Sequence, residues 1–91
     1  MIEKMQTALK ALRNIAGLTT AELGECIGTT KQTISNLEIG KAKMKKHQYI
    51  AIRVVFEKLA EENNQLKLAK EVLLGDKYEG IDFLKELNKG L

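Results

Sequence analysis

Two short amphipathic helical patterns meet at a single glycine between Thr19 and Gly40, in the stretch TTAELGECIGTTKQTISNLEIG. Its large apolar residues form one pair before that glycine and one pair after it: Leu23, Ile27, Ile34 and Leu37. The glycine, Gly28, can adopt a left-handed conformation that turns the chain sharply. Two helices joined by so tight a turn must touch near their crossing, and this favours a small residue one turn earlier, where Gly24 stands.

This order of small, apolar and glycine positions is typical of a helix-turn-helix, whose second helix commonly lies in the major groove of DNA. We expect the first helix of the pair to begin at Thr19, because the spacing from Thr19 to Glu22 is that of a capping box. The second helix is expected over about residues 30–39, with Thr30 as its N-cap.

The outward face of this second helix is predicted to be polar. Ile34 and Leu37 would face inward, whereas four polar residues share the opposite side: Lys31, Gln32, Ser35 and Asn36. A polar face is ordinary for a surface helix, but these side chains also suit base edges. Gln or Asn can form two hydrogen bonds with adenine, Lys can donate hydrogen bonds to guanine, and a short Ser allows close approach.

The rest of the chain also predicts helices, since Pro is absent and good helix formers dominate. An apolar stripe covers residues 2–16, up to Gly17. A helix is expected from about residue 46 to Asn63, with five apolar positions and with Arg53 and Glu57 outside; the apolar positions are Ile50, Ile52, Val55, Phe56 and Leu59. A pattern with Leu66, Ala69, Val72 and Leu73 ends at Gly75, and a last helix is expected over about residues 79–89, with Ile81, Leu84 and Leu87 on its apolar side.

These patterns predict an all-α fold: a compact helix-turn-helix domain of about five helices with a helical C-terminal extension. We place the domain at residues 1–62 and the extension at residues 63–91. The apolar stripes of the extension would suit a dimer surface, or would pack back on the domain.

Several function classes are disfavoured. No apolar run approaches the roughly 20 residues of a membrane span, and MIEKMQTALK lacks the features of a signal peptide, so a cytoplasmic protein is expected. The single cysteine, Cys26, and the single histidine, His47, form no recognised metal or disulfide pattern. No catalytic triad or Gly-rich phosphate loop is present, so we expect no enzyme and no cofactor.

Positive charge is concentrated in the first half of the chain. Residues 1–45 hold seven Lys and Arg against four acids, whereas residues 46–91 hold eight against eight. The segment KAKMKK, residues 41–46, has four lysines and no acid. Such a segment suits contact with phosphates, although alone it would more often be a solvated loop.

The stretch GLTTAELGECIGTTKQTISNLEIGK resembles the Cro/C1-type (XRE) helix-turn-helix family of phage and bacterial transcriptional regulators, which share a lambda-repressor-like fold. The resemblance covers about residues 6–60, and its most specific part is Thr33–Lys41, which is similar to the TIS-x-[IL]-E-x-G-K form of the family's recognition helix. It implies binding to double-stranded DNA, commonly as a homodimer.

The resemblance also implies roles for individual residues. Base reading falls to Lys31, Gln32 and Asn36. Contacts with the DNA backbone or groove edge fall to Thr20, Thr30, Thr33, Ser35, Lys41, Lys43 and Lys45. A partly buried salt bridge is implied between Arg13 and Glu38.

Two positions depart from the family pattern. Thr20 stands where the family usually has Gln, and its shorter side chain would need closer docking to reach a phosphate. Thr29 stands in place of the usual Val of the turn.

The leading interpretation is therefore a sequence-specific transcriptional regulator, expected to be a repressor, with the helix over residues 30–39 in the major groove. The alternative is a protein-interaction module, such as an antitoxin or adaptor, that binds a partner protein through its C-terminal helices. The apolar stripes after residue 62 favour this alternative.

Overall fold

The computed structural model describes residues 1–75. These residues form five α-helices and no strand: α1 (Ile2–Ile15), α2 (Thr20–Ile27), α3 (Lys31–Glu38), α4 (Lys46–Ala60) and α5 (Asn64–Leu74). The predicted all-α fold is thereby confirmed. The helix expected over residues 79–89 lies outside the described residues.

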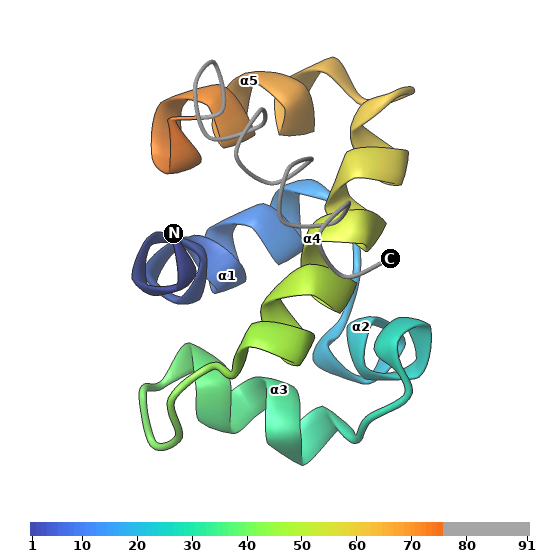
Figure 1. Ribbon diagram of the computed structural model, residues 1–91. Helices are drawn as coiled ribbons and strands as arrows, with labels where there is room; N and C mark the ends of the chain where they lie inside the picture. The colour runs from blue at the N-terminus through green and yellow to red at the C-terminus, as the bar shows by residue number, and fades with distance from the viewer. Residues whose placement is uncertain (76–91) are drawn as a thin grey trace.

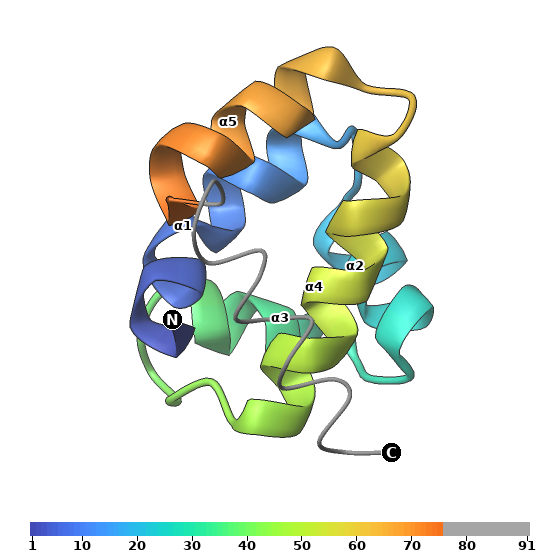
Figure 2. The same cartoon turned by 45° about the horizontal axis from the view of Figure 1, so that its top comes forward.

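Helices α1 and α4 lie in the middle of the fold, with α5 at one end and the α2–α3 pair at the other (Figures 1 and 2). The predicted stripe of α1 is buried, since Met5, Leu9 and Leu12 are fully enclosed. They meet apolar residues of the other four helices, chiefly Leu23, Ile34, Leu37, Ile52, Phe56, Leu66 and Leu74. One core thus supports every described helix. None of these helices combines the length and the apolar character that crossing a membrane requires.

The ends of α2 follow from local sequence. The Thr19 hydroxyl accepts a hydrogen bond from the Glu22 N–H at 3.0 Å, and the Glu22 carboxylate accepts one from the Thr19 N–H at 2.9 Å. These contacts with Thr19, first of all the one with its backbone N–H, hold the pKa of Glu22 below its ordinary value. Gly28 closes the helix in the left-handed conformation, with φ of 75°. The capping box and the glycine turn are both confirmed.

The sequence interpretation was wrong about Arg53. It was expected on the outer side of α4, but it is fully buried. Its Nε donates to Glu57 at 3.0 Å, and Lys70 of α5, also buried, contacts the same carboxylate at 2.9 Å. Charged side chains can take buried positions here because both share one carboxylate: Glu57 lies one turn after Arg53 on α4, and Lys70 reaches it from α5.

The inner face of α5 also differs from the expected one. Leu66 is buried as predicted, but the other buried residues of α5, one and two turns later, are Lys70 and Leu74. Val72 is 80% exposed and Leu73 is 42% exposed. The reason is that Lys70 reaches Glu57, so the face that carries it can turn inward. Helix α5 therefore packs on α1 and α4 and shares their core.

The start of α5 is fixed by Asn63. Its side chain accepts a hydrogen bond from the Leu66 N–H at 3.1 Å and donates one to the Ile15 carbonyl at 3.2 Å. One asparagine thus caps α5 and joins it to the end of α1.

The turn between α2 and α3 lies directly against Gly24. A Cβ atom at this position would lie 2.8 Å from the Thr29 carbonyl oxygen and 3.2 Å from the Thr30 carbonyl oxygen. Both are backbone atoms of the turn, which cannot rotate away as a side chain can. The small residue that the sequence led us to expect here is therefore required.

Substitution Gly24→Ala tests this contact by the sign of its effect. Helix propensity alone would stabilise the protein by about 1 kcal/mol. Because the added methyl group meets backbone oxygens, we expect instead a loss of about 1–3 kcal/mol in the free energy of unfolding, measured with urea. The exposed neighbour Glu25→Ala is the control and should change stability little. A more stable Gly24→Ala protein would contradict the close approach.

Candidate nucleic-acid interface

Helix α3 separates an apolar face from a polar one, as its sequence predicted. Ile34 and Leu37 are at most 1% exposed and anchor the helix in the core. On the opposite side Lys31 and Gln32 are exposed, and Ser35 and Asn36 are partly buried. The structure thus brings the three residues expected to read bases onto one accessible surface.

Two of these side chains form a hydrogen bond with each other. The Gln32 Nε2 donates to the Asn36 Oδ1 at 3.0 Å. This bond orients both amides yet leaves further groups available: Gln32 keeps its Oε1 acceptor and a second N–H, and Asn36 keeps two N–H donors. An amide with a donor and an acceptor side by side matches the major-groove edge of adenine.

The threonines expected near the DNA backbone lie at helix starts. Thr30 is the N-cap of α3, and its hydroxyl accepts from the Thr33 N–H at 3.2 Å and contacts the Thr33 hydroxyl at 3.1 Å. Thr20 is the first residue of α2 and is partly buried. Thr29 of the turn is also partly buried. Thr30 therefore has a structural role in capping.

The lysines after α3 lie on the loop that joins it to α4. Lys41, Lys43 and Lys45 are all exposed, whereas Met44 between them is 5% exposed and belongs to the core. The loop turns back on α3, since the Lys41 N–H donates to the Asn36 carbonyl at 2.9 Å. The loop is therefore held against the end of α3 by a buried anchor and backbone hydrogen bonds, and its lysine side chains remain exposed.

The ion pair expected between Arg13 and Glu38 is present. The Arg13 Nε and one terminal nitrogen donate to the two Glu38 oxygens at 2.6 and 3.1 Å, and the other terminal nitrogen donates to the Leu18 carbonyl at 2.8 Å. Only 10% of the Arg13 side chain and 6% of the Glu38 side chain are exposed. The hydrogen bond with Glu38 raises the pKa of Arg13 above its ordinary value, against the lowering effect of burial. This pair ties the end of α3 to α1.

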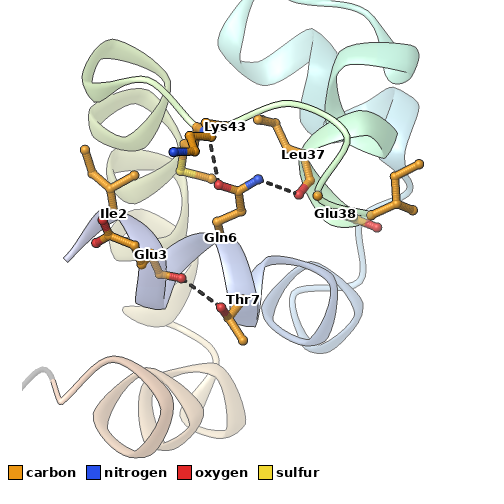
Figure 3. A pocket seen from close by; sticks show the side chains of 10 residues that line it. Ile2, Glu3, Gln6, Thr7, Leu37, Glu38 and Lys43 are labelled. Carbon is orange, nitrogen blue, oxygen red and sulfur yellow. Dashed lines mark hydrogen bonds between the residues drawn. The ribbon is translucent and has the colours of Figure 1, made fainter.

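One residue of this region was not found from the sequence. Gln6 of α1 reaches the end of α3 and the loop after it, beside an open groove of about 460 Å³ (Figure 3). Its partners lie 31 to 38 residues away along the chain. A glutamine at a polar position of an amphipathic helix gives no local signal of such contacts.

The single cysteine and the single histidine were the other residues considered as possible metal ligands. Cys26 and His47 are both exposed. Within residues 1–75, no group of His, Cys, Asp and Glu side chains is arranged to hold a metal ion.

Fold and surface together define a small all-α domain of helix-turn-helix-like architecture. Comparisons of the chain with protein-family models, with curated proteins and with solved structures found no match.

The Arg13–Glu38 pair can be tested by a double-mutant cycle. Either Arg13→Met or Glu38→Met leaves the other charge nearly buried, so each should lower the free energy of unfolding by about 3–5 kcal/mol. The double variant should lose much less than the sum, because no charge is then stranded. Urea unfolding measures all three, with the exposed Lys10→Met as control. Additive losses would contradict the direct pairing.

Proposed function

We propose that this protein is a sequence-specific DNA-binding transcriptional regulator that acts as a repressor by occupying its site. The observation that carries the proposal is the outward face of α3, where Lys31, Gln32 and Asn36 share one accessible surface beside a loop of exposed lysines. In this mechanism α3 enters the major groove, and bound protein denies the site to RNA polymerase.

Base reading in this proposal rests on the paired amides of α3. The bond between Gln32 and Asn36 fixes their orientation before DNA arrives, so less side-chain freedom is lost on binding. Lys31, one residue earlier on the same face, would contact a guanine or a phosphate.

Affinity rests mainly on the lysines. Lys41, Lys43 and Lys45 would neutralise phosphates next to the groove that α3 occupies, and counterion release would make binding steeply dependent on salt. Thr33 and Ser35, both partly buried on α3, would meet the groove edge, and Thr20 and Thr30 would approach the backbone from the helix starts.

We further propose that two copies bind a two-fold symmetric site in the cytoplasm, each with its α3 in one half-site. Such half-sites lie about 34 Å apart, one turn of the DNA helix. Selection of sites from random duplex DNA by the purified protein tests the whole proposal. A two-fold symmetric consensus supports it, and an absence of enrichment would exclude sequence-specific binding.

Two substitutions should separate base reading from backbone contact. Gln32→Ala is expected to lower affinity for the selected site by about 1–3 kcal/mol and to relax the preference at one base pair. Lys41→Ala should weaken binding to all sequences alike and reduce the slope of log K against log salt by about 1. Fluorescence anisotropy over a salt series measures both.

The matched control for this pair is Gln65→Ala, an exposed glutamine on α5, away from α3. It should leave affinity, preference and salt slope unchanged. If Gln32→Ala kept the base preference of the parent protein, the assignment of α3 as the reading helix would be wrong.

A second function is favoured by one surface. Leu68 is 61% exposed and Val72, one turn later on α5, is 80% exposed, so the two form an apolar pair that points away from the core. Exposed apolar pairs of this kind suit a protein partner. We propose as the alternative that the protein is an antitoxin or adaptor that binds its partner through this pair.

The combined substitution Leu68→Gln and Val72→Gln tests the alternative. Both residues point to solvent, so the folded state should be retained while a stoichiometric partner, captured by the parent protein from its host, should be lost. Lys67→Gln, on an exposed position of the same helix, is the control and should retain the partner. Unchanged capture by the double variant would show that this surface is not the binding site.

A further inference from the structure

Both the nitrogen and the oxygen of the Gln6 side-chain amide form hydrogen bonds with backbone atoms within residues 37–44. Its Nε2 donates to the Leu37 carbonyl at 2.9 Å and to the Ala42 carbonyl at 2.7 Å, and its Oε1 accepts from the Met44 N–H at 3.0 Å. Figure 3 shows Gln6 with its hydrogen bond to the Leu37 carbonyl. A single side chain of α1 therefore holds both the last turn of α3 and the loop that follows.

Lys43 lies between the two loop residues that Gln6 binds. The carbonyl of Ala42 precedes it and the N–H of Met44 follows it, so both peptide groups that flank Lys43 carry a Gln6 bond. The Met44 side chain is buried, whereas the Lys43 side chain is exposed. The backbone of Lys43 is thus fixed on both sides and only its charged side chain extends outward.

We infer that Gln6 is a positioning residue for DNA binding and acts through Lys43. Its bond to Leu37 fixes the loop relative to α3, so Lys43 is set to meet a phosphate when α3 lies in the groove. The inference rests on the proposed DNA-binding function and names a residue of α1 that determines part of its affinity. A lysine held in place loses less conformational freedom on binding than one on a free loop.

A double-mutant cycle between Gln6 and Lys43 tests the coupling. Affinity for the selected DNA site is measured for the parent, Gln6→Leu, Lys43→Ala and the double variant, by anisotropy over a salt series. Gln6→Leu should weaken binding to all sequences about three- to tenfold, with the preference for the selected site kept. In the Gln6→Leu background, Lys43→Ala should cost less than about twofold, and it should reduce the salt slope less than it does in the parent.

Two controls separate positioning from a general loss of structure. Gln65→Leu makes the same change on an exposed part of α5 and should leave binding unchanged. The effect of Lys31→Ala should be the same with and without Gln6→Leu, because Lys31 lies at the other end of α3 from the Gln6 bonds. Gln6→Glu provides a second variant of nearly the same size, which keeps the acceptor for Met44 but loses both donors.

Hydrogen exchange of the Met44 amide reports on the loop without DNA and should be faster in Gln6→Leu. If the parent protein selects no DNA sequence, the proposed function fails, while this exchange still tests how Gln6 holds the loop. If the parent selects DNA but the Gln6 and Lys43 effects are additive, the positioning role is overturned. Unchanged Met44 exchange would overturn it as well.

Discussion

The position of α3 depends on the close approach of the turn to Gly24. The carbonyl oxygens of Thr29 and Thr30 would lie 2.8 and 3.2 Å from a Cβ atom at position 24, which is closer than a carbon atom normally tolerates. Two residues after Gly28, Thr30 caps α3, and Ile34 of the next turn is buried in the core. The contact at Gly24 therefore helps to fix the direction of the polar face of α3 at the start of the helix.

The other end of α3 is held from α1 by two polar side chains. Arg13 binds the Glu38 carboxylate, and Gln6 binds the Leu37 carbonyl. Helix α3 has only eight residues, which is too short to be stable alone in water. Its stability therefore comes from contacts at both ends and from the burial of Ile34 and Leu37. None of these contacts uses Lys31, Gln32 or Asn36 side chains, so the outward face carries no part of this support.

The sequence predicted the features whose causes are local. A capping box within four residues, as at Thr19, and a left-handed glycine such as Gly28 are decided by neighbouring atoms. The buried position of Lys70 could not be predicted, because it reaches Glu57 across the contact of α4 with α5. Arg53 pairs with Glu57 within α4, but its burial depends on which face of α4 packs inward. A charge at a helical position normally indicates solvent, and only the tertiary contact reverses that expectation. The role of Gln6 could not be predicted either, because its hydrogen bonds reach residues that are distant in the sequence.

Substitutions at the residues that support α3 are expected to have different effects from substitutions on its outward face. Replacing Arg13, Glu38 or Gly24 would disturb the core or strand a charge, so these positions are constrained by folding. Lys31 and Gln32 are exposed, and the hydrogen bond of Gln32 goes to Asn36 on the same outward face, so neither position is constrained by the core. If α3 binds DNA, as proposed, the preferred sequence could change through these positions alone. The loop lysines would then keep the affinity for phosphate, because Gln6 and Met44 hold them independently of the reading face.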